Sequence, residues 1–207
     1  MATMSKAALR ERLLAARREV ADDVHAAEAG MLRERLEALD GLEKVGTGGT
    51  TVCAYVPVGT EPGSAGMLDL LLERAGRVLL PVARAADDGT ALPLRWGEYR
   101  PGTLIRGRWG LLEPPEPWLP ASALAEAAAV LVPALAVDRS GVRLGRGQGF
   151  YDRSLGDRHA RALLIAVVRD EEVLDVVPAE PHDVRMTHAL TPRRGLMSLF
   201  ADRHVGE

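Results

Sequence analysis

Cysteine is nearly absent from this 207-residue chain, which contains only Cys53. A single thiol excludes a disulfide framework within the chain, and the five histidines show no zinc-like spacing beside it. Because Cys53 lies inside the apolar run TVCAYVPV, the pattern is typical of a small core residue. A chain without disulfides suits a reducing compartment, so we expect a cytoplasmic location.

Long apolar runs and a large excess of either charge are also missing. No apolar run reaches the length of a transmembrane helix, and the N-terminal sequence MATMSKAALRERLLAARR lacks the apolar region of a secretory signal. The formal net charge of −3 gives no general attraction to nucleic acids or membranes. We therefore expect neither of these as a partner.

Signals for strands and helices alternate along the whole chain, without internal repeats. The β-branched, apolar runs predict strands, and the amphipathic runs between them predict helices. We expect strands at 51–58, 77–83, 130–135, 162–168 and 187–192. We expect helices from 5 to about 40 with a break near Gly30, from Ser64 to Gly76, after 121, at 150–155 and at 171–177.

This alternation predicts an α/β fold, because parallel strands are joined by helical crossovers. We expect one doubly wound, Rossmann-like domain over residues 1–207, with three layers, a mostly parallel sheet and helices on both faces. In the first helix, Ser5 is the expected N-cap. The core stripe of that helix is expected at Leu9, Leu13, Ala16, Val20 and Val24.

The stretch VRLGRGQGFYDR, residues 142–153, places glycines at 145, 147 and 149. Glycine permits positive φ angles and close approach of the backbone to another group. Successive N–H groups in such a loop can form a concave anion-binding nest, and Arg143, Arg146 and Arg153 add donors suited to phosphate. The loop also precedes an expected helix, whose N-terminus favours an anion.

This loop is not a Walker A motif, and its third glycine comes too early for a dinucleotide fingerprint. Its spacing leaves two interpretations open: an anion nest, or a glycine-rich hairpin with solubilising arginines. Asp152 is similarly open, because it can hold Mg²⁺ beside a bound phosphate or interact with the helix dipole.

The longer segment VPALAVDRSGVRLGRGQGFYDRSL resembles the signature of the 5-formyltetrahydrofolate cyclo-ligase family (5,10-methenyltetrahydrofolate synthetases). That signature has a strand ending in Val-Pro, then Asp, a glycine turn and Arg-Leu-Gly-Arg-Gly-Gly-Gly-Tyr-Tyr-Asp. The chain departs from it in two places. Gln148 replaces the middle glycine, and Phe150 replaces the first tyrosine.

Four distant segments resemble the same family in the same order. KAALRERLLAARR resembles an N-terminal helix whose Lys6 and Arg10 contact ATP, although a solvated charged face is the ordinary alternative. Lys6 is one of only two lysines in the chain. In AYVPVGTEP, the resemblance implies folate contacts at Val56 and Glu61.

The other two segments implicate the middle and the end of the chain. GRWGLLEP places Trp109 as an aromatic wall for the substrate, the alternative being a tryptophan packed under a loop. PAEPHDVRMTHALT gives Asp183 as a second magnesium carboxylate beside Asp152. His182 is interpreted as a capping or core residue rather than a catalytic one.

The resemblance implies an enzyme that converts 5-formyltetrahydrofolate and ATP to 5,10-methenyltetrahydrofolate, ADP and phosphate, with Mg²⁺ and as a monomer. This reaction needs no enzyme nucleophile, and the chain shows no nucleophile–base motif. Implied ATP contacts are Lys6, Arg10, Arg143, Leu144, Gly145, Arg146, Gly147, Gln148, Gly149, Phe150 and Tyr151. Implied folate contacts are Val56, Glu61, Trp109, Gln148, Gly149, Phe150 and Tyr151, and implied catalytic residues are Arg146, Tyr151 and Glu61.

Two other functions stay open. Related α/β folds include sugar-phosphate isomerases and CoA transferases, for which Glu61 is the only candidate base or nucleophile. A non-enzymatic or catalytically shifted folate-binding paralogue is the second, and Gln148 and Phe150 are the departures that favour it.

Overall fold

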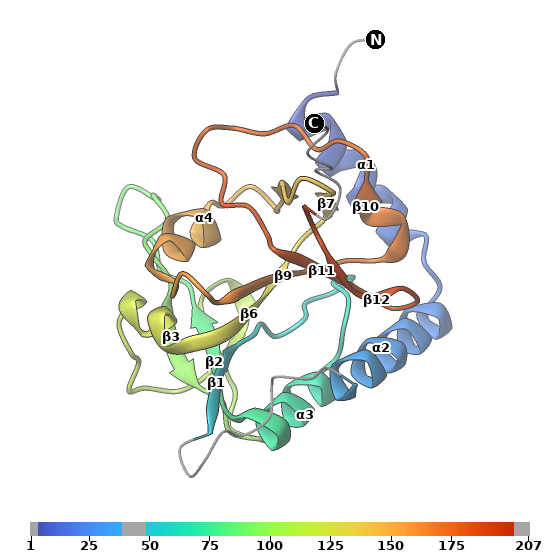
Figure 1. Cartoon of the computed structure of the whole chain (residues 1–207). Helices are drawn as coiled ribbons and strands as arrows, with labels where there is room; N and C mark the ends of the chain where they lie inside the picture. The colour runs from blue at the N-terminus through green and yellow to red at the C-terminus, as the bar shows by residue number, and fades with distance from the viewer. Residues whose placement is uncertain (1–3, 39–48, 201–207) are drawn as a thin grey trace, which may run out of the picture.

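A computed structural model of the chain describes residues 4–38 and 49–200. Its centre is one seven-stranded sheet (Figure 1). The spatial order is β12 (Gly195–Ser198), β11 (His188–Thr191), β9 (Leu163–Val167), β6 (Ala127–Pro133), β1 (Thr50–Cys53), β2 (Gly76–Val82) and β3 (Arg95–Glu98). The inner strands β11 to β2 run parallel, and the two edge strands are antiparallel.

Both faces of this sheet are buried under other elements of the chain. Successive strand residues point to opposite faces, so each strand contributes side chains to two core clusters. In β6, Leu131 packs in the cluster with α2 (Asp22–Glu37) and α3 (Ala65–Ala75). Its neighbours Val130 and Val132 pack in the cluster on the other face, with η2 (Ala121–Glu126), α4 (Phe150–Ser154) and η3 (Leu155–Asp157).

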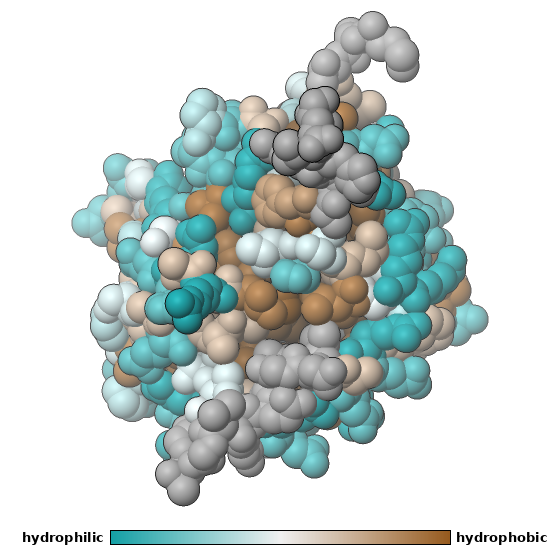
Figure 2. All heavy atoms as spheres, viewed as in Figure 1, coloured by the Kyte–Doolittle hydropathy of each residue, from teal (hydrophilic) through white to brown (hydrophobic). Residues whose placement is uncertain are grey.

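The predicted fold class is therefore confirmed. The helices on the second face are short, as Figure 1 shows, with α4 opposite α2 and α3. Figure 2, in the same view, shows apolar side chains near the middle of the side of the molecule turned to the viewer and hydrophilic ones around them. One domain over residues 1–207 stays a prediction.

Helix α1 (Lys6–Arg18) packs on a small second sheet rather than on the main one. That sheet has the order β10 (Val173–Leu174), β7 (Ala136–Asp138) and β8 (Arg143–Leu144). Ser5 caps the helix as predicted, since its side chain accepts a hydrogen bond from the N–H of Ala8. Leu9 and Leu13 are buried in a cluster with Leu135, Val142 and Leu144. The β7–β8 hairpin leads directly into the glycine loop.

The predicted break near Gly30 is wrong. Gly30 lies inside α2, and the chain breaks instead between the end of α1 at Arg18 and the start of α2 at Asp22. A helical glycine costs only about 1 kcal/mol, and the buried Leu32 and Leu36 outweigh that cost by packing. The predicted end of the helix near residue 40 lies outside the described residues.

The predicted apolar stripe is only partly confirmed. Leu9 and Leu13 are buried, whereas Ala16 and Val24 are exposed. Ala16 lies off the buried face of α1, and the break between α1 and α2 interrupts the periodicity before Val24. Arg17 is buried in their place.

Several other elements differ from the sequence-based expectation, in part because distant segments pair with each other. The helix predicted at 171–177 is wrong: one 3-10 turn, η4 (Asp170–Glu172), is followed by β10, whose residues pair with Val137 and Asp138. The strand predicted at 51–58 ends at Cys53, and the chain then leaves the sheet. The hairpin of β4 (Ile105–Arg106) and β5 (Leu112–Glu113) was not predicted.

Candidate active site

A cavity of about 490 Å³ opens at the carboxyl ends of the central parallel strands. From β1 the chain continues to β2 on one side, and it later returns to β6 on the other side of β1. Such a switch in strand order leaves a crevice in which doubly wound folds bind ligands. The residues that follow these strands line the cavity: Tyr55 and Val56 after β1, Ala83 after β2, and Ala134 and Leu135 after β6.

The glycine loop forms one wall of this cavity. Gly147 and Gly149 have φ angles of +96° and +74°, which explains why glycine stands at these two positions. None of the backbone N–H groups of residues 146–149 donates a hydrogen bond to another described residue. The loop therefore presents consecutive free donors, as an anion nest requires. Helix α4, which follows, is only five residues long, so its dipole adds little.

Helix α1 brings two cations to the same wall. The Nε of Arg10 donates to the carbonyl oxygen of Gly145 at 2.9 Å, and a side chain at Gly147 would lie 3.4 Å from the Arg10 guanidinium carbon. Lys6 lies one turn earlier on the same helix face. The structure thus places Lys6 and Arg10 against the cavity, not on a solvated face.

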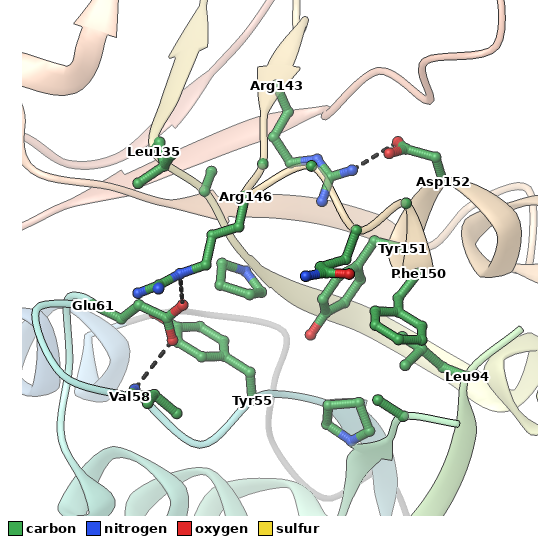
Figure 3. A pocket seen from close by; sticks show the side chains of 18 of the residues that line it. Tyr55, Val58, Glu61, Leu94, Leu135, Arg143, Arg146, Phe150, Tyr151 and Asp152 are labelled. Carbon is green, nitrogen blue, oxygen red and sulfur yellow. Dashed lines mark hydrogen bonds and ion pairs between the residues drawn. The ribbon is translucent and has the colours of Figure 1, made fainter. Parts of the chain in front are cut away.

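Two ion pairs order the arginines of the loop (Figure 3). Arg143, almost fully buried, donates to Asp152 Oδ1 at 2.7 Å. Arg146 reaches across the cavity, and its Nε donates to Glu61 Oε1 at 2.9 Å. Glu61 also accepts from the backbone N–H of Val58 at 3.1 Å, so its carboxylate is held in one orientation.

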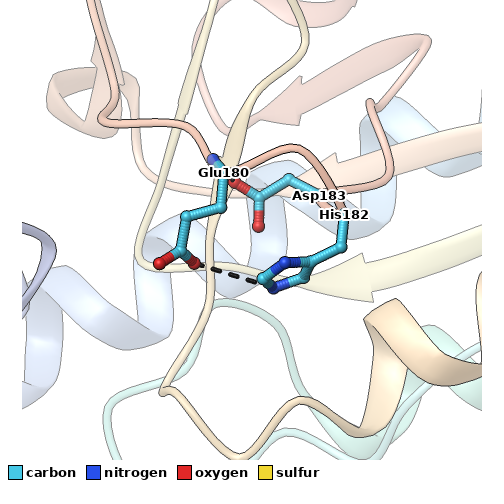
Figure 4. A group of neighbouring side chains, drawn as sticks. All are labelled: Glu180, His182 and Asp183. Atoms are coloured by element: carbon cyan, nitrogen blue, oxygen red, sulfur yellow. Dashed lines mark hydrogen bonds and ion pairs between the residues drawn. The ribbon is translucent and has the colours of Figure 1, made fainter.

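The segment that follows β10 brings together three side chains with metal-binding groups: Glu180, His182 and Asp183 (Figure 4). One ligand atom from each lies within 4.8 Å of the other two. The Lys6 ammonium stands between the two carboxylates, 2.7 Å from Glu180 Oε2 and 2.8 Å from Asp183 Oδ2. Burial opposes the Lys6 charge, but the hydrogen bonds to Asp183 and Glu180 outweigh it and raise the pKa of the ammonium.

For Asp183, burial likewise opposes the charge. Hydrogen bonds from Lys6 and from the backbone N–H of Glu180 outweigh this and hold the pKa of Asp183 below its usual value. The carboxylate therefore remains ionised, as a metal ligand must be.

At the β4–β5 hairpin the lining is mainly aromatic and aliphatic, although Arg108 and Glu113 also line the cavity there. Trp109, on the β4–β5 hairpin, is 56 % exposed, and its ring centroid lies 5.8 Å from that of Phe150 at a tilt of 55°. Val56, Val58 and Leu94 line the same cavity. Trp109 is thus an open aromatic edge, which is inconsistent with a tryptophan packed under a loop.

The hydroxyl of Tyr151 is buried and has no hydrogen-bond partner among the described residues. Burial, together with the nearby charge of Glu61, raises the pKa of Tyr151 well above its usual value, so the phenol stays protonated. In Figure 3 this hydroxyl points away from the loop backbone, toward the side of the cavity where Tyr55 and Glu61 lie. An unpaired buried donor costs free energy, and a ligand oxygen would satisfy it.

The site residues that the family resemblance implies all line this one cavity: Lys6, Arg10, Val56, Glu61, Trp109, Arg143, Leu144, Gly145, Arg146, Gly147, Gln148, Gly149, Phe150, Tyr151, Asp152 and Asp183. Arg153, expected as a further phosphate donor, lines only an adjoining hollow. Asp152 is not in the metal-capable group of Asp183, but it lines an adjoining hollow together with His182.

Sequence reasoning missed several lining residues, among them Arg17, Tyr55, Arg108 and Glu180. Arg17 is the most informative of these, because it lies 2 % exposed on the same helix face as Lys6 and Arg10. Its Nε donates to Glu172 Oε1 at 2.6 Å, and one terminal nitrogen donates to the carbonyl of Ala134 at 2.6 Å. The spacing of 6, 10 and 17 along one face was the signal that could have revealed it.

The sequence model of the 5-formyltetrahydrofolate cyclo-ligase family matches residues 2–192. The chain belongs to this family. It is 59 % identical to the 5-formyltetrahydrofolate cyclo-ligase of Mycolicibacterium smegmatis over 199 residues, which cover 96 % of this chain and all of that protein. The Escherichia coli K12 cyclo-ligase is 27 % identical over 146 residues, covering 70 % of this chain and 79 % of the relative.

Solved structures of the family share the fold. The 5,10-methenyltetrahydrofolate synthetase of Aquifex aeolicus superimposes with a TM-score of 0.77 at 22 % identity, covering 99 % of this chain and 97 % of that one. The synthetase of Mycoplasma pneumoniae gives 0.66 at 19 % identity, over 88 % and 96 %. Membership in the cyclo-ligase family confirms the predicted family and the prediction of an enzyme. Among the described helices, none has the length and hydropathy to cross a bilayer.

Proposed function

We propose that the protein converts 5-formyltetrahydrofolate and ATP to 5,10-methenyltetrahydrofolate, ADP and phosphate. The observation that carries the proposal is a single cavity with two unlike ends. One end combines free backbone N–H groups with cations, which suits the phosphates of a nucleotide. The other is apolar with an aromatic edge, which suits the pterin of a folate. The names of the relatives support the same reaction.

For the nucleotide, we assign the phosphates to the N–H groups of residues 146–149 and to the cations around them. Arg143 and Arg146 supply planar guanidinium donors, and Lys6 and Arg10 approach from α1. Leu144, Gly145 and residues 147–151 complete the proposed contacts with ATP. Because Gly147 has positive φ, the loop backbone can come close to the phosphates.

Magnesium is part of the same proposal, with Asp152 and Asp183 as its ligands. The residues suit this ion, because carboxylate oxygens are the ligands that Mg²⁺ prefers. The Lys6 ammonium, bound between Glu180 and Asp183, occupies the position of a cation beside Asp183, and the Arg143 guanidinium does so beside Asp152. Bound magnesium would neutralise the phosphate charge that develops during transfer.

For the folate, we assign the pterin to the apolar end, against Val56, Trp109 and Phe150. Gln148 and Gly149 lie at the apex of the loop, where the two ligands would meet. Glu61, held by Arg146 and by the N–H of Val58, would accept the proton that N10 loses. The unpaired hydroxyl of Tyr151 would donate to a substrate oxygen.

The chemistry explains these residue types. A formamide carbonyl is a weak electrophile, and transfer of the γ-phosphoryl group to its oxygen creates a good leaving group. N10 of the folate then attacks the formyl carbon and loses its proton, the carbon–oxygen bond breaks, and phosphate leaves as the ring closes. The protein contributes positioning and charge neutralisation rather than a nucleophile. Arg146, which lies beside both the loop and Glu61, would meet the transferred phosphoryl group.

Appearance of the methenyl product, followed by its near-ultraviolet absorbance, tests the function directly. We expect product from 5-formyltetrahydrofolate only when ATP and Mg²⁺ are both present, with one ADP released per product. Product formed without ATP would contradict the proposed reaction. No product under any condition would favour a folate-binding paralogue, and turnover of a sugar phosphate or CoA ester would favour the other alternative.

A cytoplasmic location and a monomeric state stay predictions. The monomer is tested by the mass of the protein in solution, with and without ATP.

A further inference from the structure

The charged side chains that line the cavity largely neutralise one another through ion pairs. Six Lys and Arg residues and five Asp and Glu residues line it, so the two signs are nearly balanced. In three ion pairs, a cation that we assign to phosphate is bound to a carboxylate that we assign to magnesium or folate. The pairs are Lys6 with Asp183, Arg143 with Asp152, and Arg146 with Glu61.

Lys6 shows this most clearly, because each of its three ammonium protons has a carboxylate acceptor. Its Nζ lies 2.7 Å from Glu180 Oε2, 2.8 Å from Asp183 Oδ2 and 3.0 Å from Asp183 Oδ1. The Lys6 and Asp183 side chains are only 15 % and 9 % exposed, so solvent screens the pair weakly. No proton of Lys6 is left to donate to a phosphate while this pair persists.

Arg143 and Asp152 form a second, partly buried ion pair, although the Nε of Arg143 has no hydrogen-bond partner among the described residues. The Arg143 side chain is 4 % exposed, and Asp152 Oδ1 accepts from it at 2.7 Å. A metal ion that took this carboxylate would leave a buried cation without its counter-charge, which is costly unless another anion replaces it. A phosphate of the nucleotide is such an anion.

Arg10 behaves differently and serves as a contrast. Its Nε donates to the neutral carbonyl of Gly145, and no carboxylate among the described residues pairs with it. Arg10 is therefore already available to a phosphate, whereas every proton of Lys6 is occupied and Arg143 and Arg146 each have one nitrogen bound to a carboxylate. Of the four cations that we assign to phosphate, three are paired with carboxylates and Arg10 is not.

We propose that metal and nucleotide enter this cavity by an exchange of ion-pair partners: the carboxylates of Asp152 and Asp183 pass to the metal as Arg143 and Lys6 pass to the phosphates. This inference rests on the proposed function and deepens it. Each ligand releases the residues that the other needs, so the two bindings are coupled. By linkage, the metal strengthens ATP binding by the same factor as ATP strengthens metal binding.

The exchange predicts that removing a carboxylate from the site raises the affinity for metal-free ATP. Replacing Asp183 or Asp152 by asparagine removes the competing charge, so each variant should bind metal-free ATP more tightly than the wild type. The same variants should bind Mg·ATP more weakly, because a metal ligand is lost. If the ion pairs only stabilised the fold, both affinities would fall together or neither would change.

Calorimetric titration of the full chain tests this. With ATP and excess chelator, we expect Asp183→Asn and Asp152→Asn to bind about fivefold more tightly than the wild type or better. With excess Mg²⁺ we expect both to bind at least about tenfold more weakly. Glu126→Gln is the matched control, since Glu126 pairs with Arg77 at 2.6 Å but does not line the cavity. It should change neither affinity.

A second titration measures how the same ion pairs affect the affinity for the metal alone. With Mn²⁺ alone and no nucleotide, Lys6→Gln should raise the affinity about fivefold or more, because the ammonium no longer competes. Adding Asp183→Asn to that variant should cancel the gain. Circular dichroism of each variant verifies that it is folded.

The outcomes are distinct. Weaker binding of metal-free ATP by both Asp variants, or unchanged Mn²⁺ affinity of Lys6→Gln, overturns the exchange. A wild-type chain that binds no ATP even with Mg²⁺ overturns the proposed function itself.

Discussion

The charged end and the apolar end of the cavity are built in different ways. At the charged end, Lys6, Arg143 and Arg146 are each held by a carboxylate at 2.7 to 2.9 Å. At the apolar end, Trp109 and Leu112 are 56 % and 42 % exposed, on a hairpin of two short strands.

This difference assigns different tasks to the two ends. Ion pairs hold the cations and carboxylates of the charged end side by side before a ligand arrives, so each partner is within reach when the phosphates and the metal replace it. The apolar end offers surface that is buried only when a ligand covers it. Changes at the charged end should therefore alter binding and turnover strongly, and changes at the apolar end should alter folate affinity modestly.

The largest effect is expected from Gly147→Val. The position has a φ of +96°, where a branched residue is strained by about 1–2 kcal/mol, and the Cβ would lie 3.4 Å from the Arg10 guanidinium carbon. The loop would shift and remove hydrogen bonds to the phosphates worth about 1.5–3 kcal/mol each. We expect calorimetry to show a loss of ATP affinity of about 100-fold or more, while circular dichroism stays that of a folded protein.

Gly102→Val is the matched control for backbone strain. Gly102 has a φ of +75°, a Cβ there would meet nothing within 4 Å, and the residue does not line the cavity. This variant should keep its ATP affinity. Equal losses in both variants would show that positive φ alone, rather than the loop, explains the result.

Asp152→Asn is expected to have the next largest effect, on turnover. It leaves Arg143 less neutralised and removes one proposed metal ligand, so Mg·ATP-dependent formation of the methenyl product should fall by about two orders of magnitude or more. Asp157→Asn, on the exposed turn that follows α4, should be unaffected. Near-wild-type turnover of Asp152→Asn would contradict the metal assignment and with it the task given to the charged end.

Local sequence patterns were sufficient to predict the parallel core of the sheet. The β-branched runs around Val52 and Leu79 and the helix between them predicted a parallel βαβ unit, which the register of β1 and β2 confirms. The break between α1 and α2 was not predictable in this way, because it contains neither glycine nor proline and depends on how each helix packs.

For the site, too, the sequence indicated which residues take part but not how they contact one another. The resemblance pointed to residues that line one cavity, but no pattern could show that Lys6 pairs with Asp183, since the two lie 177 positions apart in the chain. The buried pair of Arg17 and Glu172 escaped notice for the same reason, with a separation of 155. Contacts at such separations depend on the complete fold, and in this cavity they carry most of the charge arrangement.

The smallest effect is expected from Trp109→Ala, at the apolar end. The ring is half exposed and touches only Phe150 and Arg108 among aromatic and cation–π contacts in the described chain, so its removal should hardly alter stability. An aromatic contact with the pterin is worth about 0.5–1.5 kcal/mol, so the KM for the folate should rise about threefold to tenfold. The KM for ATP should not change, because no phosphate-binding residue moves. Steady-state kinetics with each substrate varied separate the two values, and Trp109→Phe should recover most of the loss. If the KM for ATP rose equally, the two ends would not be independent, and the division of the cavity into a phosphate-binding charged end and a folate-binding apolar end would be wrong.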